Sequence, residues 1–438
     1  MMPKYHKQIR IIFLFFFLIT GLSARSQVKQ FLPPWEKGMI DIHFISNGVG
    51  NCAFYILPDG TTLLVDAGEE DPTSARTNSP RNTPRYPNYS KLGHEWQADY
   101  INQQLKNLHQ DYIDYVLISH FHGDHFGSLY SGMPKSANGD YYLTGITGVG
   151  DKIKIKKLID RGFSYPTNMR KQALTDSARF AVMINYWKFI SAQQSKNNLK
   201  HEDFIVGSKN QFSLTKEPSA FANFSIRNIN ANGIVWTGKD DGSVISKMPP
   251  VSNGRDYDKQ PEENPLSCGI KIKYGNFSFF TSGDIAGKQP DFMKAPEWID
   301  VESLVAPTVG EVDVATCNHH ANRDAMSAYY LSVLKPRVIV QEVWSSDHPG
   351  HETLLRMTSK NIWPAERDLF ATNMLLANKL VIGELVDKSY KSTQGHIVIR
   401  VLPPGDKYYV YILNNESTEN NVTNVFGPYY SKNKLNQQ

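Results

Sequence analysis

Short apolar runs separated by turn residues dominate the chain from residue 39 to residue 65. Residues 39–44 alternate apolar and polar positions, whereas residues 52–57 and 61–65 are more continuously apolar. Pro58-Asp59-Gly60 between the last two runs is typical of a tight turn. The pattern predicts three successive strands that form a β-meander.

Helical and strand-like patterns alternate through the rest of the chain. Apolar residues at helical spacing predict a helix over 95–108, and further helices are expected over 175–193 and around 325–334. Residues 71–90, rich in Pro, Ser and Asn, predict a long loop. Strands are expected over 115–118, 269–274, 277–281, 312–315, 337–343, 396–401 and 408–412. This mixture favours an α/β sandwich over an all-β fold.

The first 26 residues have the order of a secretory signal peptide. Lys4, Lys7 and Arg10 precede the apolar run 11–20, which small and polar residues follow. The run is shorter than the about 20 residues of a membrane span, although an uncleaved anchor is the alternative. We therefore expect an exported, periplasmic or extracellular protein with no stable membrane span after cleavage. Residues 27–412 are expected to form one domain with an elaboration at about 131–260, followed by a polar tail over 413–438.

Charge and cysteine content restrict the function only weakly. Among 438 residues, 47 are basic and 43 acidic, and this balance does not by itself indicate nucleic-acid binding. The three cysteines, Cys52, Cys268 and Cys317, permit at most one disulfide, so the chain is not a disulfide scaffold. Cys317 precedes a histidine pair but is interpreted as a core residue rather than a metal ligand.

A histidine-rich loop directly follows the apolar strand predicted over 115–118. Its sequence is Ser119-His120-Phe121-His122-Gly123-Asp124-His125. Three imidazoles and a carboxylate within six residues suit zinc or a similar divalent ion. The alternative is a solvated polar loop, but a second carboxylate follows another apolar strand at Gly283-Asp284. A carboxylate at that place can bridge two cations that share one water.

These motifs resemble the metallo-β-lactamase superfamily. The resemblance rests on His120-x-His122-x-Asp124-His125, on residues 63–68 before it and on Gly283-Asp284 after it. Within the superfamily the chain is most similar to the soluble hydrolase domain of ComEC/Rec2-like proteins, through segments 44–51, 263–267, 318–320 and 347–349. The matching pieces run from about residue 39 to residue 355. The fold that this implies is a four-layer αββα sandwich with its metals at one edge of the two sheets.

The resemblance also implies the metal ligands. His120, His122 and Asp284 are expected to hold the first ion. Many members of the superfamily add a third histidine from the segment between the histidine loop and Asp284. His201 is the sole histidine in that segment, and Asn264 stands where the ligand would be expected. For the second ion we expect Asp124, His125, Asp284 and one further histidine. His319, His320, His348 and His351 compete for that place, and His320 is slightly favoured. Asp66 is expected to orient a ligand, and the remaining residues near the site or substrate are Asn264, His319 and His348.

The implied activity is hydrolysis by a metal-bound hydroxide, with Asp124 as the proton acceptor. Two divalent ions are expected, zinc first, with manganese and iron as the alternatives. Similar proteins point to a phosphodiester substrate, either a small molecule or a nucleic acid. A lactam or lactone hydrolase and a catalytically silent binding protein are the competing hypotheses. The basic cluster Lys152, Lys154, Lys156, Lys157 and Arg161 is interpreted either as a guide for an anion or as a solvated strand face; the oligomeric state is not predicted.

Overall fold

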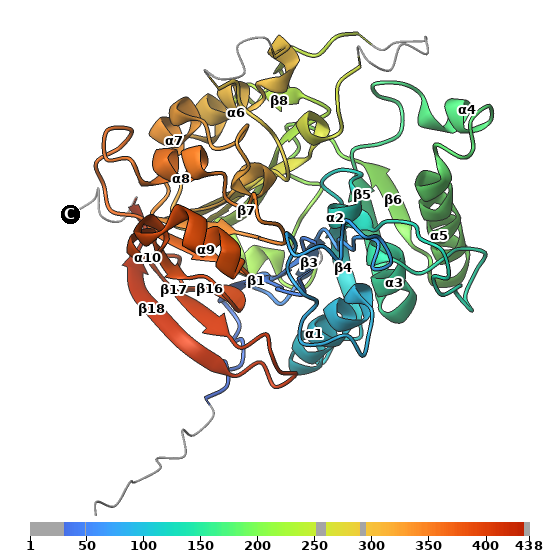
Figure 1. Ribbon diagram of the computed structural model, residues 1–438, viewed down its shortest axis with the longest axis horizontal. Coiled ribbons are helices and arrows are strands. Elements are labelled where there is room, and N and C mark those ends of the chain that lie inside the picture. Colours follow the sequence, from blue (N-terminus) through green and yellow to red (C-terminus); the bar gives the residue numbers. More distant parts are fainter. Residues whose placement is uncertain (1–29, 49, 251–259, 290–294, 433–438) are drawn as a thin grey trace, which may run out of the picture.

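Two nine-stranded sheets face each other and carry helices on their outer surfaces (Figure 1). The computed structural model describes residues 30–48, 50–250, 260–289 and 295–432. The first sheet has the order β18-β17-β16-β1-β2-β3-β4-β5-β6. Its strands are β1 (Ile40–Phe44), β2 (Ala53–Ile56), β3 (Thr62–Val65), β4 (Tyr112–Leu117), β5 (Lys154–Asp160), β6 (Lys200–Asp203), β16 (His396–Leu402), β17 (Lys407–Leu413) and β18 (Val422–Tyr430).

The second sheet has the order β15-β14-β13-β12-β11-β10-β7-β8-β9. Pairing is parallel from β11 to β15 and antiparallel from β11 through β10 to β9. Its strands are β7 (Phe224–Ala231), β8 (Ile234–Trp236), β9 (Val244–Ser246), β10 (Gly269–Tyr274), β11 (Phe277–Thr281), β12 (Val314–Thr316), β13 (Val338–Gln341), β14 (Asp368–Ala371) and β15 (Tyr390–Ser392).

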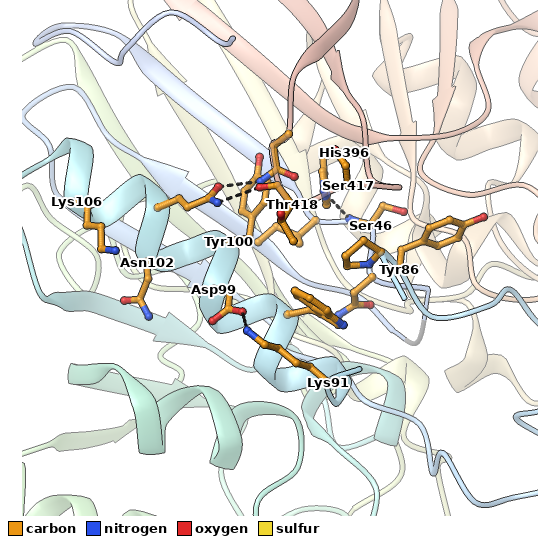
Figure 2. Close-up of a pocket in the computed structure, with 16 residues that line it drawn as sticks. Ser46, Tyr86, Lys91, Asp99, Tyr100, Asn102, Lys106, His396, Ser417 and Thr418 are labelled. Atoms are coloured by element: carbon orange, nitrogen blue, oxygen red, sulfur yellow. Dashed lines mark hydrogen bonds and ion pairs between the residues drawn. The ribbon is translucent and has the colours of Figure 1, made fainter. Parts of the chain in front are cut away.

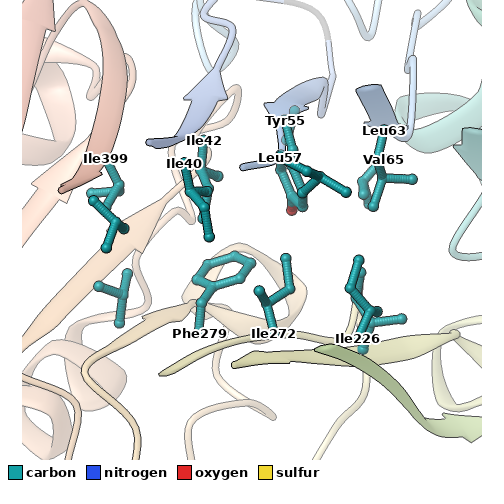
Figure 3. Close-up of a cluster of buried hydrophobic side chains, with 14 of the residues drawn as sticks. Ile40, Ile42, Tyr55, Leu57, Leu63, Val65, Ile226, Ile272, Phe279 and Ile399 are labelled. Atoms are coloured by element: carbon teal, nitrogen blue, oxygen red, sulfur yellow. The ribbon is translucent and has the colours of Figure 1, made fainter. Parts of the chain in front are cut away.

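Three apolar clusters give the sandwich its four layers. One lies between the sheets, where Ile40 and Ile42 of β1 face Ile272 and Phe279 of the second sheet (Figure 3). The others bury the outer face of each sheet beneath helices, so the αββα architecture expected from the sequence is confirmed. The helices are α1 (Gly93–Asn107), α2 (Gly123–Phe126), α3 (Gly145–Lys152), α4 (Met169–Ala173), α5 (Ala181–Asn197), α6 (Glu302–Val309), α7 (Ala328–Leu334), α8 (His351–Thr358), α9 (Leu376–Ile382) and α10 (Glu384–Ser389).

The segment 131–260, expected as an elaboration of the domain, contributes strands to both sheets. β5 extends the first sheet by pairing with β4, and β7 pairs with β10 inside the second sheet, with Ile226 opposite Ile272. The sequence of β7 does not show the apolar pattern of a buried strand, because Asn228 and Asn230 occupy interior positions. Their side-chain NH₂ groups donate to the backbone carbonyls of Ile205 and Ser267, so these buried donors have partners within the protein.

Part of the polar tail expected over 413–438 forms a strand. Val422–Tyr430 forms β18, an edge strand paired with β17. Most of its side chains are exposed, so it lacks the apolar alternation of a half-buried strand. Tyr429 nevertheless anchors it, since its ring stacks on Tyr408 and its hydroxyl donates to Asp368.

None of the helices within the described residues is long and apolar enough to cross a membrane. The signal peptide expected over residues 1–26 lies outside those residues, so it stays a prediction.

The inter-sheet core generates a stability prediction. Phe279 is fully buried, with its ring 5.8 Å from that of Tyr55 in an edge-to-face contact. Phe279→Ala should lower the free energy of unfolding by about 3–5 kcal/mol, because it leaves a cavity between the sheets. The matched control Phe31→Ala removes a ring that is 57% exposed and should change it by less than about 0.5 kcal/mol. Equal urea midpoints for the two variants would contradict this packing.

Candidate metal centre

The histidine loop leaves the carboxyl end of β4 and turns back through the single-turn helix α2. Backbone contacts hold this turn against the ends of neighbouring strands: the Asn51 N–H donates to the Asp124 carbonyl at 2.7 Å, and the Ala67 N–H to that of His125 at 2.9 Å. Gly68 approaches so closely that an added Cβ would lie 1.7 Å from the Asp124 carbonyl oxygen. The glycine of the Asp66-Ala67-Gly68 segment is therefore required for the loop to seat.

Asp66 fixes the orientation of His125. The Asp66 carboxylate accepts the Ser119 N–H and the Ser119 hydroxyl, each at 2.7 Å, and lies 2.8 Å from His125 Nδ1. This contact leaves His125 Nε2 to face the cluster, where it lies 3.2 Å from Asp284 Oδ1. A carboxylate that orients a liganding imidazole in this way is a common feature of metal sites.

Asp284 follows β11 and lies at the centre of the cluster. Ser267 Oγ accepts its backbone N–H at 3.0 Å, which fixes its position. Asp284 Oδ2 lies 3.5 Å from His320 Nε2 and 3.8 Å from His120 Nε2, while Oδ1 faces His125. One carboxylate therefore contacts imidazoles from two separate parts of the chain.

The backbone at residues 319–321 determines which histidine of the pair enters the cluster. His319, His320 and Ala321 all have positive φ angles, between 43° and 60°. His320 points inward, with Nε2 3.1 Å from Asp124 Oδ2 and Nδ1 3.2 Å from the Glu342 carbonyl oxygen. His319 turns aside and lies 2.7 Å from Asp324 and 3.0 Å from the Asn264 amide nitrogen.

The donor atoms form two groups that share Asp284. One contains Asp124, His125, Asp284 and His320, and the other contains His120, His122 and Asp284. Within each group all the donor atoms lie within 4.8 Å of one another. His120 Nε2 and His122 Nδ1 are 3.2 Å apart, a contact that requires a proton or a cation between two lone pairs.

Buried atoms without hydrogen-bond partners support a cation at this place. His125 Nε2 and Asp284 Oδ1 face each other at 3.2 Å without the geometry of a hydrogen bond, and Asn264 Oδ1, buried in the wall of the same cavity, has no hydrogen-bond partner among the described residues. Buried polar atoms are normally satisfied, so atoms that converge unsatisfied indicate an absent ligand. Imidazoles and carboxylates in this arrangement suit two divalent ions such as zinc.

The other candidate residues lie at different places. His348 is buried and stacks on His320 with ring centroids 4.4 Å apart, so it lines the cavity without joining either group. His351 begins α8 and is exposed. Cys317 is buried with its Sγ 3.7 Å from the Met357 sulfur, as a core residue should be. His201 lies on β6, 2.8 Å from Asp160.

The cluster attracts positive charge strongly. Burial opposes protonation of His320, but Asp284 and Asp124 outweigh it and raise its pKa to about 10. The same carboxylates, with Asp66, raise the pKa of His125 above its usual range in spite of burial. Burial likewise favours the neutral acid of Asp124, yet His125 and His320 hold its pKa well below the ordinary value. Protons on the imidazoles thus provide the charge that divalent ions would otherwise supply.

Several residues outside the histidine loop also shape the site. Arg161 forms a buried bidentate ion pair with Glu263 at 2.6 and 2.7 Å, and Glu263 accepts the Phe121 N–H of the histidine loop. Trp344 Nε1 donates to Asp124 at 3.0 Å. Arg76 and Arg81 line the cavity above the cluster.

The basic cluster at residues 152–161 does not line this cavity. Four of its members lie in ion pairs with neighbouring acidic residues, which favours the structural interpretation over an anion guide. The pairs are Lys152 with Glu95, Lys156 with Asp114, Lys157 with Glu202 and Arg161 with Glu263.

Residues 46–143 match the family profile described as the Metallo-beta-lactamase superfamily. This segment, less than a quarter of the chain, is therefore similar to domains of that superfamily. It includes the complete histidine loop, and the match points to a metal-dependent hydrolase. The finer similarity to ComEC/Rec2-like proteins stays a prediction.

Comparisons with whole proteins add little to this assignment. No curated protein matches the chain. The crystal structure of Zn(2+)-bound PqqB from Methylobacterium extorquens is similar with a TM-score of 0.36 and 10% identity, over 82% of this chain and 99% of that one. A likeness of this size carries no argument about function.

The sharing of Asp284 predicts how metal content responds to substitution. The wild-type chain should hold two divalent ions by elemental analysis. His122→Ala and His320→Ala should each lose about one ion, whereas Asp284→Ala should lose both, because both groups contain it. His351→Ala removes an exposed nearby histidine and should retain both. Full metal content in Asp284→Ala would contradict the shared site.

Metal loading should release protons. In the metal-free chain His320 has a pKa of about 10 and is protonated at pH 7, so a cation must displace that proton. Apparent metal affinity should therefore rise as the pH rises towards 10 and fall as it drops. Calorimetric titration of zinc in buffers of different ionisation enthalpy measures the released protons. An identical heat in all buffers would be inconsistent with the displacement.

Proposed function

We propose that the chain is an exported, metal-dependent phosphodiesterase. The observation that supports a phosphodiester is the cavity of about 290 Å³ above the metal centre, which Arg76 and Arg81 line together with the ligands. Both arginines come from the long loop between β3 and α1. A guanidinium presents a planar fork of donors that matches the oxygens of a phosphate.

The charged side chains around the cavity favour an anionic substrate. Arg81 lies 3.1 Å from Asp347, and both side chains are partly exposed, so the pair is readily reorganised. Burial and the charge of Asp124 raise the pKa of Glu70, another lining residue, to about 7, while Arg76 acts in the opposite direction. Once two divalent ions occupy the centre, the cavity carries a net positive charge that attracts a phosphodiester.

Two bound divalent ions would lower the pKa of water and polarise the scissile group. Asp124 remains ionised, because neighbouring imidazoles hold the pKa of its carboxyl low. Trp344 Nε1 donates to its Oδ2, which fixes the carboxylate so that it can orient the nucleophile. We therefore assign Asp124 the role of an orienting ligand rather than that of a proton acceptor.

Asn264 supplies a fixed polar group opposite the histidine loop. Its NH₂ group lies 3.0 Å from His319 Nε2, and His319 Nδ1 lies 2.7 Å from Asp324. This chain of contacts fixes the amide so that Oδ1, buried without a partner among the described residues, remains available to a ligand. Asn264 therefore takes the place of the third histidine expected at the first metal.

A direct assay tests the substrate class. The purified chain with metal should hydrolyse bis-p-nitrophenyl phosphate, with single-stranded DNA tested beside it, and should leave nitrocefin intact. Asp124→Asn should lower kcat at least about 100-fold, since it removes an oriented carboxylate at the reacting centre. Lys209→Ala changes an exposed residue and is the control for effects of expression and purification on the measured activity. Nitrocefin turnover without phosphodiester turnover would replace this proposal with the lactam hydrolase.

The arginines predict a separate effect on binding. Arg76→Ala should raise KM for the phosphodiester with little change in kcat, because it removes a contact present before and during the reaction. Arg170→Ala on α4, which does not line the cavity, is the matched arginine control. An unchanged KM in steady-state kinetics of Arg76→Ala would be evidence against phosphate recognition by this loop.

A further inference from the structure

A second and larger cavity, of about 620 Å³, lies between α1 and the turn that connects β17 to β18 (Figure 2). It shares no lining residue with the cavity of the metal centre. The loop between β3 and α1 contributes to both, through Arg76 and Arg81 at the metal centre and through Tyr86 and Pro87 here. Its volume is in the range that holds a drug-sized or disaccharide-sized ligand.

Fixed hydrogen bonds hold the walls of this cavity. The Gln103 side chain on α1 donates to the Thr418 carbonyl at 3.1 Å and accepts from the Asn420 amide at 2.8 Å, which ties the helix to the β17–β18 turn. On the opposite wall His396 Nδ1 accepts the Ser46 N–H at 3.0 Å. The cavity is thus a preorganised feature of the fold rather than a gap between loose segments.

The lining is rich in groups that hydrogen-bond to hydroxyls. His396 is neutral, because burial and nearby His43 lower its pKa to about 3, and its ring is already held by the Ser46 N–H and by a side-chain hydrogen bond with Asn420. Asn102 of α1, which is half-buried, adds an amide to the lining. Ser417 Oγ is buried and has no partner among the described residues, which indicates a missing one.

The charges of the lining select against a phosphate. Lys91 and Asp99 form an ion pair at 2.5 Å, so they contribute no net charge, and Asp99 repels a dianion. Lys106 lines the cavity without an acidic partner among the described residues. One unpaired ammonium matches one carboxylate.

The aromatic residues also disfavour a nucleobase. The Lys91 ammonium lies 4.8 Å from the centre of the Trp96 ring and covers one of its faces. The remaining apolar surface, from Ile45, Tyr86 and Pro87, forms a wall beside many polar groups. An apolar wall beside polar groups suits a ligand whose ring presents C–H groups on its face and hydroxyl groups around its edge.

We propose that this cavity binds a saccharide that carries a carboxylate, such as a uronic acid unit. Its hydroxyls pair with Asn102 and Ser417, its ring lies against Tyr86 and Pro87, and its carboxylate reaches Lys106. The ligand binds independently of hydrolysis at the metal centre, because the two cavities have separate linings.

Calorimetric titration of the full chain with digalacturonic acid tests this site, with lactose as a neutral disaccharide and AMP as a phosphate. Digalacturonic acid should bind with one-to-one stoichiometry and more tightly than lactose. Lys106→Ala should weaken its binding about fivefold and leave that of lactose unchanged, as expected for one partly exposed ion pair. Lys209→Ala is the lysine control and Asp124→Asn the control for the metal centre, and both should bind like the wild type.

Asn102→Trp provides the test of location, since the indole ring would fill the cavity from α1. It should abolish binding of both sugars, with its fold checked by an unchanged unfolding temperature. Sugar binding that persists in folded Asn102→Trp would overturn the assignment of the site. Failure of digalacturonic acid to bind, or AMP binding that Asn102→Trp removes, would overturn the ligand class.

Discussion

Two buried carboxylates, those of Asp124 and Asp284, lie together at the edge of the sandwich, and their negative charge determines what this edge can hold. Removing such charges from water costs several kcal/mol per ion unless positive charge and hydrogen bonds replace the lost hydration. The imidazoles of His125 and His320 supply that charge as protons, which their raised pKa values express. A pair of divalent ions would supply it with the ligand chemistry that these side chains match.

The fold provides the rigidity that this arrangement requires. Each ligand follows the end of a strand or a short turn whose backbone is held from both sides. Asp66 orients His125, the Glu342 carbonyl lies against His320, and Glu263 ties the histidine loop to the segment that carries Asn264. Because these contacts join both sheets, the packing between the sheets and the geometry of the centre depend on each other.

Local patterns made part of this site predictable. The ligands from His120 to His125 lie within one loop after an apolar strand, and Asp284 ends another, so their positions follow from the strands alone. The choice of His320 over His319 did not follow, because it depends on three consecutive positive φ angles. Arg76, Arg81 and Trp344 come from irregular segments that no spacing connects to the histidine loop.

The same distinction explains what was predictable in the fold. The strands with apolar alternation appeared as expected, as β10 and β11 show. β7 was missed because buried asparagines interrupt its apolar pattern, and β18 because an edge strand exposes most of its side chains. In both strands, tertiary hydrogen bonding and pairing decide the conformation where the local sequence is ambiguous.

Anomalous diffraction from crystals grown with zinc tests the central claim most directly. The account predicts two peaks about 3.5–4 Å apart, one on each side of the Asp284 carboxylate. One should be bound by His120 and His122, and the other by Asp124, His125 and His320. A single peak, or peaks away from Asp284, would contradict the account.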